Sequence, residues 1–171
     1  DTVGRNAIPV FISVLGEDEQ HEDLTQSILE LLLEVLGGRP NVGSAADGIA
    51  AAKMNTQEAT EGPRSIAQLV VSNTAWVDVL LNLLQHRALW TRLLTIQILT
   101  ALHIAAPSRT GSALLACGGG MMRLLDALSD TREEIRNELL LLLSLLTYRN
   151  MEMQTFLAFQ EGFPRLAAIL Q

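Results

Sequence analysis

Hydrophobic positions repeat along this chain in three long stretches, which start at Ile8, Trp76 and Met121. Each stretch begins with an amphipathic helix, passes through a short polar turn, and ends with a second helix that is apolar on nearly all faces. A fourth copy begins at Phe163 with FPRLAAIL. The pattern predicts a chain built from repeated pairs of helices.

The spacing of equivalent leucines indicates the kind of repeat. Leu84 and Leu128 are 44 residues apart, and Leu128 and Leu170 are 42 residues apart, within the roughly 40 to 47 residues of HEAT and armadillo repeats. Short apolar segments at residues 112–117 and 153–159 precede the third and fourth copies and predict one more helix per unit. Three helices per unit favour an all-α, armadillo-like solenoid, a right-handed superhelix, over the two-helix HEAT arrangement.

A leucine-rich helix and its polar approach fit this architecture. Residues 139–146 read LLLLLSLL. In a stacked solenoid the last helix of each unit packs against its own unit and both neighbours, so almost no side faces water. The preceding turn predicts a capping box, in which Asp130 caps the helix amides, Glu133 returns to the cap and Glu134 adds negative charge at the positive helix end.

We expect residues 1–171 to form a single armadillo-like domain that is a fragment of something longer, because the chain starts without an initiator methionine and ends without a helix stop. The expected parts are a repeat at about 1–36, an insertion at about 37–65, repeats at about 66–106 and 107–150, and a truncated repeat at 151–171. The insertion lacks apolar periodicity and is rich in small residues and proline, which predicts a disordered or loosely ordered segment. A tolerated surface insertion is favoured over a docking or modification loop.

Composition narrows the class of protein. Of the 171 residues 49% are hydrophobic but only 4% are aromatic, so aliphatic side chains must form the core. The net charge of −7 opposes binding to phosphates, and we therefore expect no nucleic-acid partner. No stretch reaches the roughly 18 to 20 apolar residues that span a bilayer. The lone Cys117 allows no internal disulfide, which is typical of a cytoplasmic protein.

The residues that could carry chemistry do not form a reactive cluster. His21, His86 and His103 belong to different repeat units, and none has an acidic residue or cysteine at the spacing of a metal site. We expect His21 and His86 in turns and His103 at a helix end. Residues 116–120, ACGGG, lack the spacing of a phosphate-binding loop and predict a glycine helix stop. The sequence therefore predicts no enzyme, no cofactor and no metal.

Armadillo solenoids commonly bind partners along a groove. Trp76 would lie on a second helix and Trp90 at the start of a third, without the matching row of asparagines that lines the groove of nuclear-import and cadherin-type armadillo proteins. This argues against that kind of peptide groove. A generic armadillo adaptor that binds peptide segments of partner proteins remains the alternative function.

Two segments carry a family resemblance. Residues 124–147, LLDALSDTREEIRNELLLLLSLLT, and residues 153–170, MQTFLAFQEGFPRLAAIL, resemble the armadillo-like globular head of the general vesicular transport factor family, the Uso-type vesicle tethers. The similarity is most specific from Met121 to Leu170 and fainter over residues 1–36 and 74–105. It implies part of the head of a vesicle-tethering factor that acts in ER-to-Golgi and intra-Golgi transport and docks vesicles before membrane fusion.

The resemblance also implies partners and a location. The partners are a Rab-type small GTPase, SNARE proteins, golgins and other tethering complexes, with a head homodimer in the full-length protein. The location is cytoplasmic, peripheral on Golgi and transport-vesicle membranes through those partners. Arg132, Arg136 and Asn137 match the family motif near a helix start, so they are candidate partner-binding residues. The favoured alternative is that Arg136 and Asn137 bond neighbouring carbonyls and fix the turn.

Overall fold

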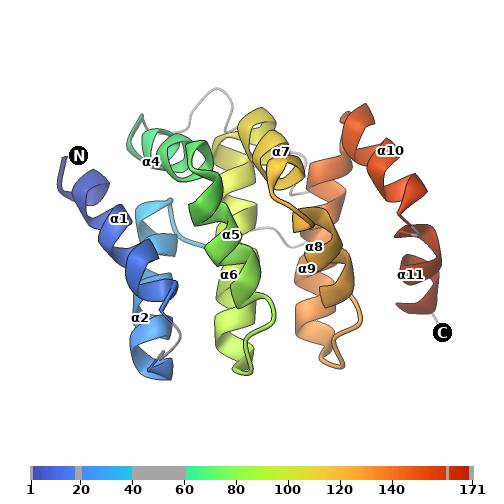
Figure 1. Cartoon of the computed structure of the whole chain (residues 1–171), viewed down its shortest axis with the longest axis horizontal. Helices are drawn as coiled ribbons and strands as arrows, with labels where there is room; N and C mark the ends of the chain where they lie inside the picture. Colours follow the sequence, from blue (N-terminus) through green and yellow to red (C-terminus); the bar gives the residue numbers. More distant parts are fainter. Residues whose placement is uncertain (1, 18–20, 40–60, 161, 170–171) are drawn as a thin grey trace.

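A computed structural model describes residues 2–17, 21–39, 61–160 and 162–169. All regular structure in these residues is helical (Figure 1). The helices are α1 (Thr2–Leu15), α2 (Glu22–Val35), α4 (Glu61–Ser72), α5 (Thr74–Leu83), α6 (Leu89–Ala105), α7 (Pro107–Ala116), α8 (Gly120–Ala127), α9 (Glu133–Thr147), α10 (Met151–Phe159) and α11 (Gly162–Ile169).

The helices stack as repeated units along the long axis of the molecule (Figure 1). One complete three-helix unit consists of α4, α5 and α6, and the next consists of α7, α8 and α9. The third helices α2, α6 and α9 pack in a row, while α4 contacts α7 and α5 contacts α8. The additional helices predicted around residues 112–117 and 153–159 are α7 and α10. The predicted all-α, armadillo-like solenoid is confirmed.

Polar residues mark two changes of direction between helices. Asn73 separates α4 from α5, and its Oδ1 accepts a hydrogen bond of 3.1 Å from a first-turn amide of α5. Asn150 caps α10 in the same way at 3.2 Å, after Arg149 has taken a left-handed φ of 52°. No single described helix is long and apolar enough to cross a membrane; α4 and α5 reach that length and composition only together, and the chain bends by 92° between them.

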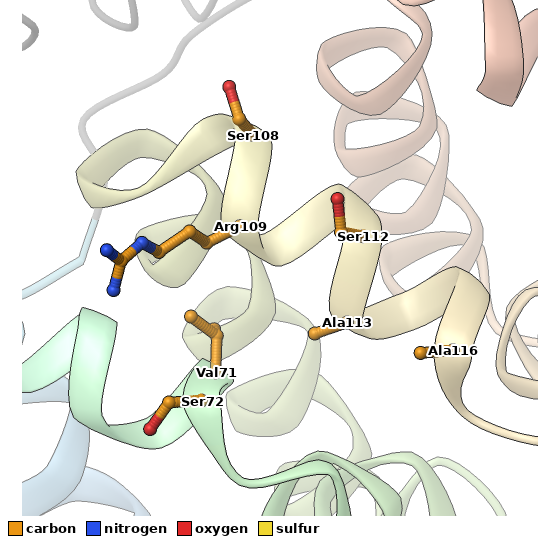
Figure 2. Close-up of a pocket in the computed structure, with 7 residues that line it drawn as sticks. All are labelled: Val71, Ser72, Ser108, Arg109, Ser112, Ala113 and Ala116. Carbon is orange, nitrogen blue, oxygen red and sulfur yellow. The ribbon is translucent and has the colours of Figure 1, made fainter.

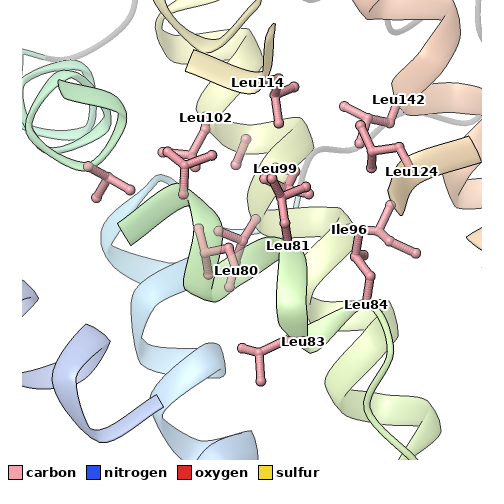
Figure 3. Packing of buried hydrophobic residues seen from close by; sticks show 14 of the residues in the cluster. Leu80, Leu81, Leu83, Leu84, Ile96, Leu99, Leu102, Leu114, Leu124 and Leu142 are labelled. Carbon is pink, nitrogen blue, oxygen red and sulfur yellow. The ribbon is translucent and has the colours of Figure 1, made fainter. Parts of the chain in front are cut away.

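The helix α6 is enclosed on all sides. Every residue from Leu93 to Ile104 is buried, because α2 and α9 flank α6 while α4, α5 and α7 cover it. Figure 3 shows Leu80 and Leu81 of α5 reaching towards Leu99 of α6. Leu99 is 0% exposed, and full burial of such a side chain contributes about 1.5 to 3 kcal/mol. A third helix that is apolar all round is therefore what this position requires.

The leucine-rich helix α9 is enclosed less completely. Leu140 and Leu141 are only half-buried, because among the described residues α9 has another third helix, α6, on one side only. The prediction of near-complete enclosure is thus confirmed for α6 and holds in part for α9. The buried positions of α9 are Ile135, Leu139, Leu142, Leu143, Leu145 and Leu146.

Arginine–aspartate pairs connect successive second helices. Arg123 Nη1 of α8 lies 2.7 Å from Asp78 Oδ1 of α5, and Arg165 Nη1 of α11 lies 2.5 Å from Asp126 Oδ1 of α8. The carboxylates are exposed to 44% and 52%, and exposed pairs contribute only about 0 to 1 kcal/mol each. Burial of the leucines, not these pairs, therefore holds the units together.

The predicted insertion at residues 37–65 is described only at its ends. Residues 40–60, which make up most of the insertion, lie outside the described residues. At the other end α4 already begins at Glu61, which corrects the expected return of the repeat at Ile66. Pro63 does not prevent this start, because the amides of the first helical turn have no partner within the helix and proline lacks only such an amide.

Candidate functional site

The sequence-predicted site lies on the turn between α8 and α9. Asp130 in this turn pairs with Arg92 of α6: Arg92 Nη1 and Asp130 Oδ2 are 2.8 Å apart, and the side chains are only 19% and 9% exposed. Asp130 Oδ1 also accepts a hydrogen bond of 2.9 Å from the backbone N–H of Arg132. The Asp130 carbonyl accepts a third bond of 2.8 Å from Arg136 Nη1. One aspartate thus holds the turn to both α6 and α9.

This geometry corrects the predicted capping box. Arg132 occupies the N-cap position and makes no side-chain cap bond, while Glu133 is the first residue of α9. Asp130 therefore stands two residues too early to cap the helix, and its carboxylate bonds Arg92 instead. Glu133 and Glu134 do lie in the first turn of α9, where the helix dipole favours negative charge. The sequence around Asp130 does not predict Arg92 as its partner, because Arg92 lies almost one repeat earlier in the chain.

The three predicted residues have different surroundings. Arg136 is half-buried and fixes the turn through the Asp130 carbonyl, as the structural interpretation expects. Arg132 and Asn137 are exposed, and neither side chain has a hydrogen-bond or ion-pair partner within the described part of the chain. The expected bond from Asn137 to a neighbouring carbonyl is therefore wrong. Arg132 thus presents a guanidinium to solvent on a turn that Asp130 holds, and Asn137 presents a carboxamide to solvent from α9 itself.

Polar side chains also cross the contact between α6 and α9. Gln97 Nε2 donates a hydrogen bond of 3.2 Å to Glu138 Oε1. His103, in the last turn of α6 as predicted, is 6% exposed. Burial lowers the pKa of His103 from 6.5 to about 4, although a hydrogen bond to the backbone of Leu145 raises it. His103 is therefore neutral near pH 7 and packs within the interface.

The other predicted turn residues occupy turns. His21 is the N-cap of α2 without a side-chain cap bond. His86 lies between α5 and α6, where its Nδ1 accepts a hydrogen bond of 3.1 Å from the Ala88 N–H. Within the described ranges no group of three or more His, Cys, Asp or Glu side chains is placed to hold a metal ion.

The segment around Cys117 is the predicted glycine helix stop. α7 ends at Ala116, and Gly119 takes a φ of 75°, which suits glycine, before α8 begins. A Cβ on Gly120 would lie 2.6 Å from the Leu114 carbonyl oxygen. Cys117 is 6% exposed, and burial raises the pKa of its thiol. A thiol that stays protonated is a poor nucleophile.

The third helix α6 offers little open surface for an extended peptide. Trp90, at the start of α6 as predicted, is 51% exposed. Trp76 lies half-buried on α5. Beyond Trp90 the helix α6 is buried from Leu93 onwards, so it presents no exposed polar row of the kind that the adaptor alternative requires.

Comparisons with known proteins extend the resemblance to the whole chain. No model of a known protein family matches it. The chain is 31% identical over 168 residues to Golgin candidate 6 of Arabidopsis thaliana, and 27% identical over 168 residues to general vesicular transport factor p115 of Homo sapiens and of Bos taurus. Each match covers 98% of this chain, which spans 17% of the length of these relatives.

Solved structures share the fold. The crystal structures of Uso1-1 and Uso1-2 superpose with TM-scores of 0.76 and 0.77 at 21% and 22% identity. Both matches cover 99% of this chain, and they cover 28% and 27% of the Uso1 chains. The sequence matches and the shared fold together place the chain in the general vesicular transport factor (Uso-type) family, as an armadillo-like segment.

Proposed function

We propose that this chain supplies a protein–protein interaction surface to a vesicle-tethering factor that acts in ER-to-Golgi and intra-Golgi transport and docks vesicles before membrane fusion. The similarity to the p115 and golgin relatives along 98% of the chain supports this role. Because the chain spans only 17% of those relatives, it would contribute one surface to the activity of a longer protein. That protein would be cytoplasmic and peripheral on Golgi and transport-vesicle membranes.

The surface that fits this role is the turn before α9. Arg132 is exposed on a turn that is held by the Asp130–Arg92 pair and by Arg136, and Asn137 is exposed on α9 just beyond that turn. A backbone fixed before binding loses less entropy when a partner docks. An exposed arginine offers a fork of donors to carboxylates and carbonyls, and arginine is enriched among the residues that dominate binding energy.

A Rab-type small GTPase is the partner that we assign to this turn. Arg132 and Asn137 would contact the GTPase, and Arg136 would act as a positioning residue. SNARE proteins, golgins, other tethering complexes and a second copy of the head would bind elsewhere on the full-length protein. No part of the proposal requires a cofactor.

Nucleotide-dependent binding tests the proposal. The chain, and the longer head of which it would be a part, would each be titrated with early-secretory Rab-type GTPases loaded with GDP or a GTP analogue. We expect both to bind the GTP form selectively. Binding by the longer head alone would move the site outside these repeats, and binding by neither would overturn the assignment of a GTPase partner.

A further inference from the structure

An open groove lies between the first helices of the two complete units, away from the turn before α9. It has a volume of about 380 Å³ and runs between the end of α4 and the length of α7 (Figure 2). Val71 and Ala113 are buried at its floor, with Ala116 further along α7. Ser108 and Ser112 are exposed on the α7 side.

The shape of the groove suits a helix. From Ser108 to Ala116 the lining residues of α7 recur every three or four positions, so they follow one helix face over about 12 Å. Apart from Arg109, the side chains on that face are short, and helices approach most closely where the side chains between them are small. The described residues contain no strand whose edge could pair with an extended peptide. A helix laid between α4 and α7 is therefore the matching mode of recognition.

The positive charge of Arg109 indicates that a helix bound in the groove would be acidic. Arg109 is exposed, and Figure 2 shows its side chain extending from α7 to the side of the groove where α4 lies. Its guanidinium has no hydrogen-bond or ion-pair partner among the described residues, whereas Arg92, Arg123 and Arg165 each pair with an aspartate. Arg132 and Arg87 also lack a partner there, but Arg109 is the unpaired arginine that lines the groove, on a chain with a net charge of −7.

The polar groups around Arg109 also favour a negatively charged ligand. Ala106, the N-cap of α7, provides no side-chain bond to the amides of the first turn, so these amides add positive potential near Arg109. The hydroxyls of Ser108 and Ser112 are not bonded to other described residues, whereas Ser72 Oγ donates to a carbonyl of its own helix at 2.7 Å. Free donors next to an unpaired guanidinium complement carboxylates.

We infer that the α4–α7 groove binds a short acidic, amphipathic helix of a partner protein. An apolar side chain of that helix would rest on Val71 and Ala113, and a carboxylate one or two turns away would pair with Arg109. The serine hydroxyls of α7 would bond the polar edge of the same helix. This interaction does not depend on GTPase binding at the turn before α9.

The test uses the complete 171-residue chain and labelled model peptides. One peptide of about 18 residues, long enough to form a helix, carries a leucine stripe flanked by glutamates; its counterpart has lysine in place of each glutamate. Fluorescence anisotropy measures binding to the wild type, Arg109→Glu and Ser112→Trp. Arg87→Glu is the matched control, because Arg87 is exposed in the α5–α6 turn and has no partner among the described residues.

We expect the acidic peptide to bind and added salt to weaken the complex. Arg109→Glu should weaken binding by about fivefold or more, since it removes an ion pair and introduces repulsion. Ser112→Trp should weaken binding by filling the groove, and Arg87→Glu should leave it unchanged within about twofold. Circular dichroism would verify that each variant remains folded.

Several results would overturn the inference. The basic peptide could bind as tightly as the acidic one, or Arg109→Glu could behave like Arg87→Glu. Absence of any binding by the acidic peptide would also contradict it. Phosphatidylserine vesicles serve as a further arm, and Arg109-dependent binding to the vesicles in place of the peptide would assign the groove to a membrane surface instead.

Discussion

Replacing Asp130 by alanine tests whether the Arg92–Asp130 pair holds the turn before α9. A second pair in the chain is a matched comparison: the N–O distances are 2.8 Å for Arg92–Asp130 and 2.7 Å for Arg123–Asp78. The aspartate side chains are 9% and 44% exposed, so the two pairs differ mainly in burial. Asp130→Ala would leave the Arg92 guanidinium without its carboxylate, and Arg92 Nε is already buried without a partner.

The burial of each pair sets the expected loss of stability. Removing one partner of a fully buried pair costs about 3 to 5 kcal/mol, whereas an exposed pair is worth about 0 to 1 kcal/mol. Asp130 lies near the buried limit, so we expect Asp130→Ala to lower the free energy of unfolding by about 2 to 3 kcal/mol. Asp78→Ala should cost less than about 1 kcal/mol. For a chain of this size the first loss corresponds to a decrease in Tm of about 4 to 12 °C.

Urea unfolding followed by circular dichroism measures both variants against the wild type. A double-mutant cycle with Arg92→Ala isolates the interaction, and we expect a coupling of about 1 to 2 kcal/mol. If Asp130→Ala costs no more than Asp78→Ala, or if the cycle shows no coupling, the pair does not hold the turn and the rigid presentation of Arg132 fails with it.

Three further predictions concern stability. Leu99→Ala, at a side chain that is 0% exposed, should cost about 3 to 5 kcal/mol in urea unfolding, whereas Leu31→Ala, at 53% exposure, should cost less than about 1 kcal/mol. The pKa of His103 is lowered from 6.5 to about 4, so as the pH falls the unfolded chain protonates at His103 before the folded chain does. The contribution of His103 to stability should therefore be constant above pH 6.5 and fall by up to about 3 kcal/mol towards pH 4, and His103→Gln should remove that part of a pH titration of unfolding. In Gly120→Ala the added Cβ would meet a carbonyl oxygen at 2.6 Å, so this variant should lose about 1 to 3 kcal/mol of the free energy of unfolding and have a lower Tm. Gly62→Ala should show no such loss, because the space around Gly62 is open.

Repeat spacing predicts the architecture because each unit must bury the same faces in the same order. The step of 44 residues between Leu84 and Leu128 requires equivalent packing, and both leucines are buried at 3% and 2% exposure. The all-round apolar pattern of α6 likewise predicts a helix with neighbours on every side. The glycine stop after Cys117 is predictable because a left-handed φ at Gly119 is a local requirement.

Tertiary contacts explain what the sequence pattern misses. Asp130 stands where a cap is expected, but Arg92 from the previous unit competes for its carboxylate and shifts the helix start to Glu133. Pro63 suggests a break, yet it falls in the first turn of α4, where proline is tolerated. The α4–α7 groove joins Ser72 to Ser108 across two units, and no local pattern contains both.

The most direct measurement of the central claim is the affinity of the GTP-loaded GTPase for two variants of the chain. Arg132→Glu reverses a charge on the turn that Asp130 holds, and Arg87→Glu makes the same change on an exposed arginine of the preceding unit. We predict that Arg132→Glu weakens binding by about tenfold or more, the scale of an interface hot spot, while Arg87→Glu leaves the affinity within about twofold. Equal affinities for the two variants would contradict the assignment of the turn before α9 as the surface that binds the GTPase.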